Sequence, residues 1–430
     1  MELPRLRGKN RGFPLRIAIY SHYFLPEIGA PSARIGDFAT QWQADGHRVQ
    51  IATCFPSHPT GVIYPGYKRQ LYRKEELGGL EVHRSWTYIA PNKGFLRKSI
   101  GHATFWISAG CLSTRRMPAP DCVIGSSPTF FAAMAARACA RRHRVPFIME
   151  VRDLWPAIFV DLGVIRNHRI IRLLERWEMN LYHSAARIVT VTESFRENLI
   201  RRGIAPEKIV TITNGADVDY WRPESVGTDA LRQELGLQNA FIALYIGAHG
   251  ISQGLSAVIR TAERLRNEPR VRFVFVGEGA DKEQLVREAG RLKLTNVRFV
   301  DSVGKSKVRN YYAMADVCLV PLRDIPLFDT FIPSKMFEIM AMGRPIIASV
   351  RGEAAEILRR SGAAAVVDPE DDQAIAAAIT QMCGSGLMTS EMGIRGRRFV
   401  TANYSRRELA RRYLEVIDEA RAIAGSGQGK

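Results

Sequence analysis

The chain has 430 residues, 46% of them hydrophobic and 24% charged, a globular composition that excludes disorder as the main state. A single hydrophobic core stops growing near ~250–300 residues, so two domains are expected. The formal net charge of +18 favours an acidic partner without naming one.

Short β-branched runs alternate with helical segments from end to end, which is the pattern of parallel α/β sheets. The strands predicted in the first half are Arg16–Tyr20, Arg48–Thr53, Cys122–Gly125, Pro146–Val151, Ile188–Thr192 and Ile209–Thr213. Those predicted in the second half are Phe241–Ile246, Arg272–Val276, Val297–Val300, Val317–Pro321, Pro345–Ala348 and Ala364–Val367. Helices such as Ala33–Asp45, Ser256–Asn267 and Asp281–Arg291 separate them. We therefore expect an α/β protein with two Rossmann-like, doubly wound parallel sheets that face a central cleft.

The domain boundary is predicted after the turn residues 214–217, where a polar stretch, Tyr220–Thr228, begins. The predicted parts are a basic tail (1–15), a first domain (16–219), a second domain (220–402), a C-terminal helix that crosses back toward the first domain (403–424) and a frayed tail (425–430).

A basic, amphipathic segment lies within residues 82–120, which contain no acidic residue. Its cations are Arg84, Lys93, Arg97, Lys98, Arg115 and Arg116. Apolar residues between 95 and 111, including Trp106, follow helical spacing. Such a helix can lie in the surface of an anionic membrane, where each nearby cation contributes ~1 kcal/mol. A core helix with a solvated basic rim fits equally well, whereas no zinc finger, RNP pattern or basic zipper supports nucleic-acid binding.

Membrane-spanning and metal-binding classes are not supported. No apolar stretch reaches the ~18–20 residues of a spanning helix, and the basic start is not followed by the apolar region of a signal peptide. The six cysteines lie far apart with no C-x-x-C pair, which excludes a disulfide framework and a zinc site. We expect buried cysteines, a reducing cytoplasmic compartment and no metal ligands.

Glycine-containing loops follow the first strand of each half. Gly29 and Ala30 precede the first helix, and Gly247, His249, Gly250 and Gly254 follow the strand Phe241–Ile246. Free N–H groups at a helix start can bind a phosphate, although a plain strand-to-helix loop is the alternative. The next strand ends at Gly277, Glu278 and Gly279, but Lys282 occupies the third glycine position of a dinucleotide fingerprint. That mismatch argues against an NAD-dependent oxidoreductase.

The strongest local signal is the segment Ile332–Ser349, in which Pro333 and Ser334 predict a helix start. Lys335 can neutralise a phosphate, and Glu338, one turn further on the same face, can accept hydrogen bonds from a vicinal diol. This layout suits a nucleotide. The alternative is a Ser/Glu capping pair beside a surface lysine.

In the first half, the strand Pro146–Val151 is followed by Arg152 and Asp153, with Glu150 inside its end. Ionisable residues at the carboxyl end of a parallel strand favour a site over a structural salt bridge.

With these residues in place, the chain resembles the retaining glycosyltransferases of the GT-B fold, in the large family numbered four, over roughly residues 16–424. The motifs that carry the resemblance are Gly29–Pro31, Asp153, Asn214–Asp217, Gly247–Gly254, Val276–Gly279 and Pro333–Pro345. The pairing of Glu150–Pro156 with Pro333–Lys335 and Glu338 is similar to a bacterial subgroup that adds N-acetylhexosamine-type sugars, such as N-acetylfucosamine, to lipid-linked O-antigen or capsule precursors.

The resemblance implies a UDP-sugar donor bound mainly to the second domain, an acceptor-side first domain and no required cofactor. Glu338 matches the second glutamate of the family's E-x7-E motif, which holds the ribose hydroxyls, while Thr330 replaces the first and Asp329 stands beside it. The family's diphosphate-binding Arg and Lys are replaced by Ala248 and Gln253. Arg152 replaces a histidine, and Asp153 keeps the acid that follows.

The resemblance assigns three sets of residues. The catalytic set is Asp153, Arg152 and Lys335. The nucleotide-sugar set is Gly29, Ala30, Gly247, His249, Gly250, Gly254, Gly277, Glu278, Ser334, Lys335, Glu338 and Thr330. The membrane or acceptor set is Lys93, Arg97, Lys98, Trp106, Arg115 and Arg116.

The expected function is transfer of a sugar, with retention of configuration, from a UDP-sugar to a lipid-linked saccharide at the inner face of the bacterial cell membrane. Two alternatives stay open: a UDP-N-acetylglucosamine 2-epimerase-like enzyme, and a catalytically silent, membrane-docked assembly partner.

Overall fold

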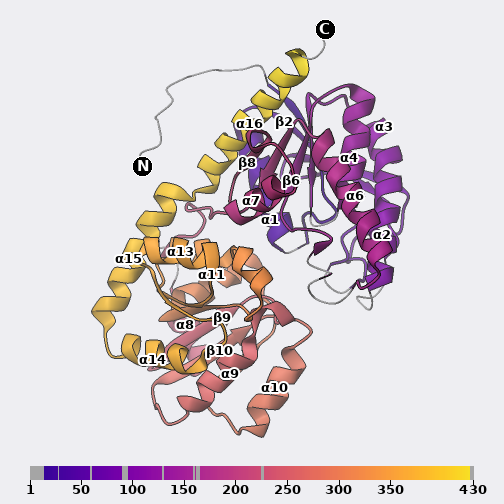
Figure 1. Cartoon of the computed structure of the whole chain (residues 1–430). Coiled ribbons are helices and arrows are strands. Elements are labelled where there is room, and N and C mark those ends of the chain that lie inside the picture. The colour runs from indigo at the N-terminus through magenta and orange to yellow at the C-terminus, as the bar shows by residue number, and fades with distance from the viewer. Residues whose placement is uncertain are drawn as a thin grey trace. The chain divides into compact units, whose positions relative to one another are not determined.

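The structure, a computed structural model, describes residues 14–27, 29–58, 61–89, 95–127, 130–157, 160, 165–223 and 227–426. The chain forms two compact units (Figure 1). Unit 1 comprises Met1–Val189, Ile204–Val210 and Tyr413–Lys430, and unit 2 comprises Thr190–Gly203 and Thr211–Arg412. The predicted domain limits at 219/220 and 402/403 stay predictions.

The sheet built mainly by unit 1 has the order β3-β4-β2-β1-β5-β6-β7-β8 in the described residues. Its strands are β1 (Arg16–Tyr20), β2 (Arg48–Cys54), β3 (Tyr72–Leu77), β4 (Leu80–Ser85), β5 (Cys122–Ser126), β6 (Phe147–Val151), β7 (Arg187–Thr190) and β8 (Ile209–Thr211). Strand β1 pairs in parallel with β2 on one side and with β5 on the other. The chain order reverses between β1 and β5, which is where ligands of doubly wound sheets bind.

The sequence analysis did not anticipate the hairpin of β3 and β4, which pair antiparallel. Gly78 and Gly79 turn it with φ angles of +57° and +82°. Strand β3 lies at the sheet edge and is rich in charged, partly exposed residues, so it lacks the apolar pattern of the central strands.

The helices associated with this sheet include the predicted amphipathic segment. They are α1 (Ala30–Ala44), α2 (Phe95–Ser108), α3 (Thr114–Arg116), α4 (Phe130–His143) and α6 (His168–Ser184), whereas α7 (Glu193–Arg201) belongs to unit 2. Helix α2 continues into α3 through a π-helical turn, Ala109–Ser113. Helices α2 and α6 both pack against α4, on the right of unit 1 in Figure 1.

The sheet of unit 2 is wholly parallel in the described chain, with the order β11-β10-β9-β12-β13-β14. Its strands are β9 (Phe241–Ile246), β10 (Val271–Val276), β11 (Val297–Val300), β12 (Val317–Pro321), β13 (Ile346–Ser349) and β14 (Ala364–Val367). Its helices are α8 (Asp229–Glu234), α9 (Leu255–Arg264), α10 (Lys282–Arg291), α11 (Lys305–Met314), α12 (Lys335–Ala341), α13 (Gly352–Ser361), α14 (Asp372–Cys383) and α15 (Gly386–Asn403). Alternate residues of β9 point into two apolar layers, Leu244 toward α12 and Tyr245 toward α9.

The last helix, α16 (Arg406–Ser426), is shared by the two units, which divide it after Arg412. In unit 1 the Tyr413 ring packs on Trp42 and Phe38, with ring centroids 5.4 and 5.9 Å apart. The helix extends to Ser426, the last described residue, and the predicted frayed tail (425–430) stays a prediction.

All six cysteines are free thiols, but Cys111 is exposed and Cys383 is only half-buried, so the prediction of buried cysteines is wrong for these two. No helix in the described ranges combines the length and the apolar character needed to cross a membrane.

Candidate functional site

Two glycine loops of unit 2 lie backbone against backbone. Gly247 follows β9 with a φ of +143°, and Gly277 follows β10 with a φ of +144°. A Cβ at Gly277 would overlap the carbonyl oxygen of Gly247, and a Cβ at Gly279 would overlap that of His249. Side chains are therefore excluded here, and the loop amides stay close to the carboxyl ends of both strands.

Lys335, the first residue of α12, places its ammonium group beside these loops. A Cβ at Gly247 would lie 2.6 Å from Lys335 Nζ, and this Nζ lies 4.0 Å from the centroid of the Tyr245 ring. No carboxylate of the described chain lies within ion-pair distance of it. Burial lowers the pKa of Lys335 to about 7, a shift that Glu338 opposes. The protein thus holds a desolvated cation that an anionic ligand would stabilise.

Glu338 lies one helical turn after Lys335 and is mostly buried. Its Oε1 is 3.7 Å from Nη2 of Arg406, and Tyr312 donates a hydrogen bond to its carboxyl group. Burial raises the pKa of Glu338 to about 7, which Lys305 and Lys335 counteract. A carboxylate held in this way keeps an acceptor oxygen for a pair of hydroxyl groups.

The predicted motif Asn214–Asp217 fixes Arg406. Ala216 makes two backbone hydrogen bonds to the residues on either side of Ser405: its N–H donates to Tyr404 O, at 3.0 Å, and its carbonyl accepts from Arg406 N, at 2.9 Å. Nε of Arg406 donates to Gly215 O at 2.9 Å. A Cβ at Gly215 would overlap Tyr404 O, so this close approach requires glycine. Sequence reasoning missed Arg406 and Tyr312 because both are distant in sequence from Glu338.

Among the other predicted residues of the nucleotide-sugar set, Glu278 and Thr330 have hydrogen-bond partners in the described chain, whereas both ring nitrogens of His249 are buried without one. The His249 side chain is fully buried, and burial lowers its pKa to about 4, so it is neutral. Glu278 accepts a hydrogen bond of 2.6 Å from Nζ of Lys282, and the Thr330 hydroxyl donates to Leu327 O at 2.7 Å. Ser334 is the N-cap of α12 but its side chain makes no capping hydrogen bond.

In the loop that ends at Gly254, Ala248 and Gln253 stand where the sequence resemblance implies an Arg and a Lys. The Gly250 N–H donates to Oε1 of Gln253 at 3.2 Å, and Gly254 adopts a left-handed conformation with a φ of +57° at the N-cap of α9. The backbone of Arg323, which follows β12, packs against Gly254 and donates a hydrogen bond to Ser252 O. This arginine is a nearby cation that the sequence analysis did not single out.

In unit 1, the charged end of β6 is buried. Glu150 pairs with Nε of Arg34 at 3.0 Å and accepts a 2.6 Å hydrogen bond from Ser126. Because Glu150 is already satisfied, it leaves Arg152 without a carboxylate partner: Nε and Nη1 of Arg152 are buried and have no hydrogen-bond partner in the described chain. A buried guanidinium with unused donors is costly unless a ligand accepts from it.

Asp153 follows Arg152 and is half-buried. Burial raises the pKa of Asp153 to about 6, although Arg152 pulls it the other way. The two predicted catalytic residues of unit 1 therefore lie together at one strand end.

Gly29, the N-cap of α1, is exposed, whereas the side chain of Ala30 lies outside the described residues.

The predicted membrane set divides into three groups. Arg97, Arg115 and Arg116 are exposed, and the Arg116 guanidinium lies over the Tyr72 ring. Trp106 is half-buried with its ring centroid 6.3 Å from that of Phe131. Lys93 and the side chain of Lys98 lie outside the described residues.

Arg84 belongs to the same basic stretch but contributes no surface charge. It is fully buried and pairs with Glu75 at 2.5 Å.

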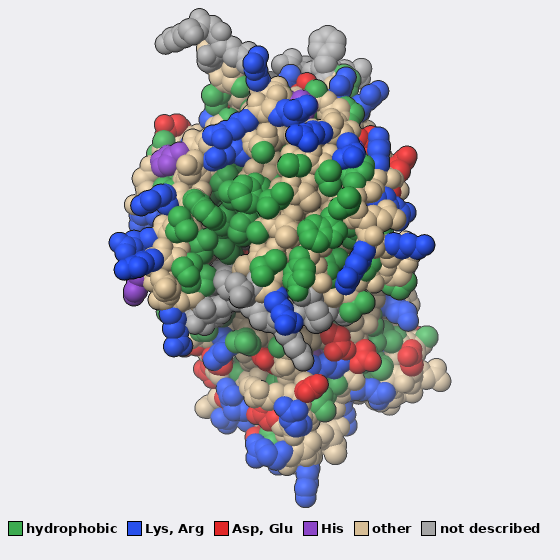
Figure 2. Space-filling view, turned by 90° about the vertical axis from the view of Figure 1, so that its right-hand side faces the viewer, with side chains coloured by type: hydrophobic (Ala, Val, Ile, Leu, Met, Phe, Trp, Pro, Cys, Tyr) green, Lys and Arg blue, Asp and Glu red, His purple; other side chains and the backbone are tan. Residues whose placement is uncertain are grey.

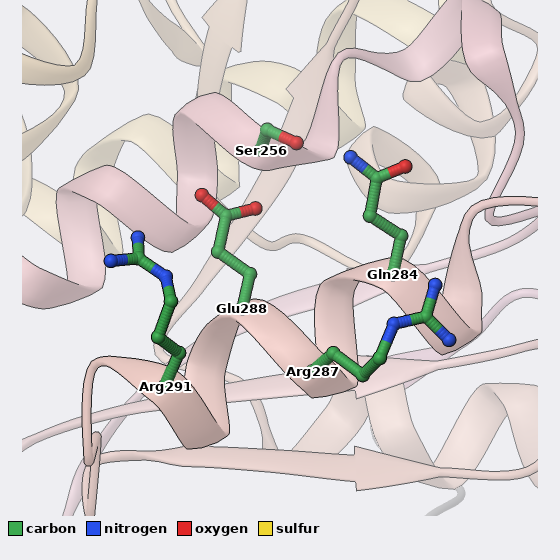
Figure 3. Close-up of a pocket in the computed structure, with 5 residues that line it drawn as sticks. All are labelled: Ser256, Gln284, Arg287, Glu288 and Arg291. Carbon is green, nitrogen blue, oxygen red and sulfur yellow. The ribbon is translucent and has the colours of Figure 1, made fainter.

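A surface hollow of about 360 Å³ between α9 and α10 is lined by none of the predicted site residues (Figure 3). It is lined by Ser256, Gln284, Arg287, Glu288 and Arg291.

Within the described ranges, no group of three His, Cys, Asp or Glu side chains is arranged to hold a metal ion.

Comparison with known proteins supports the two-domain architecture. Residues 29–215 match the glycosyl transferase 4-like domain, and residues 240–385 match the glycosyl transferases group 1 family. The "Putative colanic acid biosynthesis glycosyl transferase WcaI" of Escherichia coli (strain K12) is 27% identical over 376 residues, which cover 85% of this chain and 92% of that protein. The "Probable glycosyltransferase WbjE" of Pseudomonas aeruginosa is 25% identical over 268 residues, 60% of this chain and 64% of that protein.

Among solved structures, HepE from Anabaena in complex with UDP and glucose superposes with a TM-score of 0.70 at 17% identity, covering 94% of this chain and 99% of that one. At this identity the likeness concerns the fold. The structural likeness and the two family matches, which together span most of the sequence, agree on the same two-domain architecture. The first half of the chain thus resembles a glycosyl transferase 4-like domain, the second half resembles a glycosyl transferases group 1 domain, and the chain has the GT-B fold.

Proposed function

We propose that the protein transfers an N-acetylhexosamine-type sugar from a UDP-sugar to a lipid-linked saccharide, with retention of configuration, in the assembly of a bacterial surface polysaccharide. One observation carries the donor assignment: α12 presents a desolvated cation without a carboxylate partner, Lys335, and one turn later a buried acid, Glu338. These two groups suit the diphosphate and the ribose diol of one nucleotide. The names of two relatives, WcaI and WbjE, support glycosyl transfer, and that of WcaI supports polysaccharide assembly.

In the proposed reaction the donor's glycosidic bond breaks as the acceptor hydroxyl bonds to the same face of the anomeric carbon. The leaving diphosphate takes the hydroxyl proton and departs as UDP, so no protein nucleophile is needed. Lys335 and the amides of the Gly247 loop stabilise the charge that develops on the diphosphate. Asp153 and Arg152 orient the substrate groups that unit 1 binds.

The acceptor side is proposed to lie on the inner face of the cell membrane. Ile100 and Ile107 on α2 are 43% and 61% exposed, and on α6 the side chains of Ile170, Leu173 and Trp177 form an exposed stripe at helical spacing. The face with these helices is toward the viewer in Figure 2, where a broad hydrophobic area is framed by Lys and Arg side chains. An apolar area with a basic rim suits an anionic bilayer surface.

The donor assignment is tested by measuring sugar transfer from a panel of UDP-N-acetylhexosamines to a polyprenyl-diphosphate-linked sugar, together with UDP affinity by calorimetry. Lys335→Ala and Glu338→Ala are each expected to lower kcat/KM at least tenfold. Lys307→Ala, an exposed lysine on α11, is the matched control and should behave as wild type. Near wild-type kcat/KM in both site variants would overturn the assignment, and turnover of UDP-sugar without any acceptor would favour an epimerase.

Membrane attachment is tested by sedimentation with vesicles that contain anionic lipid. Ile107→Gln combined with Trp177→Gln should weaken binding, and added salt should weaken it further. Val286→Gln, which removes an exposed apolar side chain from α10 of unit 2, is the control. Charge reversal at Arg97, Arg115 and Arg116 that leaves vesicle binding unchanged would refute the membrane proposal.

A further inference from the structure

Three histidines gather at the carboxyl edge of the unit 1 sheet. His22 follows β1, His58 follows β2, and His102 belongs to α2. The ring centroids of His22 and His102 are 4.3 Å apart, and Tyr23 joins His22 to His58, with centroid distances of 4.9 Å to each. These residues are up to 80 positions apart in the sequence, so the fold alone brings them together.

The innermost ring, that of His22, has an unused nitrogen. The His22 side chain is 9% exposed, and its Nδ1 is buried without a hydrogen-bond partner in the described chain. Its backbone is firmly held, because its carbonyl oxygen accepts from Cys54 Sγ at 3.0 Å and from Thr53 Oγ1 at 3.3 Å. A polar atom kept inside a well-fixed loop without a partner points to a ligand rather than to packing alone.

The acid beside the cluster, Glu27, is occupied elsewhere. Its Oε1 accepts from the backbone N–H groups of Ser57 and His58, at 2.7 and 2.9 Å, and its Oε2 accepts from Phe24 N at 3.3 Å. Glu27 therefore fixes the loop after β2 instead of pairing with an imidazole. The cluster opens outward, from buried His22 through half-buried His102 to exposed His58.

We propose that His22, His58 and His102 form a diphosphate subsite for the acceptor, an inference that rests on the proposed function and names the anionic group of that substrate. Protonated imidazoles donate two N–H groups each and suit phosphate oxygens. The subsite shares α2 with Ile100 and Ile107, the exposed apolar residues of the membrane face. The diphosphate of a lipid-linked acceptor bound here would lie at the level of the lipid headgroups, and the saccharide attached to it would reach the carboxyl ends of the strands.

This subsite makes anion binding depend on pH. Burial, then His102 and His58, lower the pKa of His22, so this ring is largely neutral at pH 7 when no ligand is bound. A bound diphosphate favours the charged rings, and binding takes up protons. The other ionisable groups around the cluster are Tyr23, Glu27 and Cys54, and burial raises the pKa of each. The Arg84 guanidinium lies near Glu27 and Cys54, and its Nη1 donates a hydrogen bond to the Cys54 carbonyl oxygen. Diphosphate affinity should therefore rise as the pH falls from 8 to 6.

The test measures inorganic pyrophosphate binding by calorimetry with unit 2 saturated by UDP, so that the nucleotide site cannot take the probe. His58→Gln and His102→Gln should each weaken pyrophosphate binding at least fivefold, and wild-type affinity should rise at least threefold from pH 8 to pH 6. His183→Gln, an exposed histidine on α6, is the matched control and should leave the affinity unchanged. Histidine ring signals in NMR spectra report whether the cluster protonates on binding.

A second arm uses neutral phosphatidylcholine vesicles with and without geranylgeranyl diphosphate. Vesicle retention that needs the diphosphate lipid and is lost in His102→Gln assigns a lipid-borne diphosphate. Pyrophosphate binding without this retention assigns a soluble one. Equal pyrophosphate affinity in wild type and both cluster variants, or unmoved histidine signals, would overturn the subsite. If UDP itself does not bind, the donor assignment fails instead, so the two failures are distinguishable.

Discussion

Replacing Lys335 with methionine should stabilise the protein while weakening UDP binding. The pKa of Lys335 falls from 10.5 to about 7 in the folded state, because its ammonium group is buried beside Gly247 without an ion-pair partner. One pKa unit is about 1.4 kcal/mol, so the penalty for keeping this charge is at most about 5 kcal/mol at neutral pH. Water near the half-buried group and the lost contact with Tyr245 reduce the expected gain to about 1–3 kcal/mol.

The sign of the pH dependence follows from linkage. The folded pKa is depressed, so between pH 7 and 10.5 the unfolded chain binds more protons and wild-type stability rises with pH. The penalty is complete below pH 7 and vanishes near pH 10.5. The advantage of Lys335→Met should therefore be largest at pH 6.5 and should shrink steadily by pH 9.5.

Calorimetry measures both effects on the same samples. Scanning calorimetry should show a higher Tm for unit 2 in Lys335→Met at pH 6.5, and titration with UDP should show a 10- to 150-fold loss of affinity, about 1.5–3 kcal/mol for a charge-assisted contact. Lys307→Met, at an exposed position of α11, should change neither quantity. A lower Tm with unchanged UDP affinity would show that Lys335 is a structural residue and would refute the reasoning.

Three further predictions concern other sites. Burial raises the pKa of Glu338 to about 7, so uridine affinity should increase as the pH rises through 7, and a flat titration profile would contradict its role as a ribose acceptor. Gly215→Ala should lower the unfolding free energy by about 2 kcal/mol or more, because the new Cβ meets the backbone of Tyr404, whereas Gly290→Ala in α10 has open space and should raise it by about 0.5–1 kcal/mol in denaturant titrations. Arg34→Met should cost about 3–5 kcal/mol by leaving Glu150 buried and unpaired, and a neutral effect on urea unfolding would show that Glu150 has another partner.

Much of the fold could be predicted from the sequence, because central parallel strands are short apolar runs bounded by turns. Every predicted strand is found with ends within two residues. The β3–β4 hairpin was not predicted, because β3 is a charged edge strand without an apolar pattern. The Gly78-Gly79 pair, a common hairpin turn, was the available signal.

The candidate site was predictable only where its residues are close in sequence. Lys335 and Glu338 share one helical turn, and Arg152 and Asp153 are adjacent, so local patterns pointed to them. Arg406, Tyr312 and the three histidines come from separate elements, and no spacing rule connects them. Their juxtaposition depends on tertiary packing, which a single sequence does not display.

The division of α16 affects how such enzymes can be recombined. Because unit 1 includes Tyr413, which packs on Trp42, this unit is encoded by three separated stretches of the gene. Consider a chimera that takes residues 1–189 and 204–210 from a relative and keeps its own last helix. The helix would then pack on a surface from the other parent, and its aromatic ring at position 413 would not match the rings it meets. Exchanging specificity between relatives therefore requires moving the last codons together with the first part of the gene.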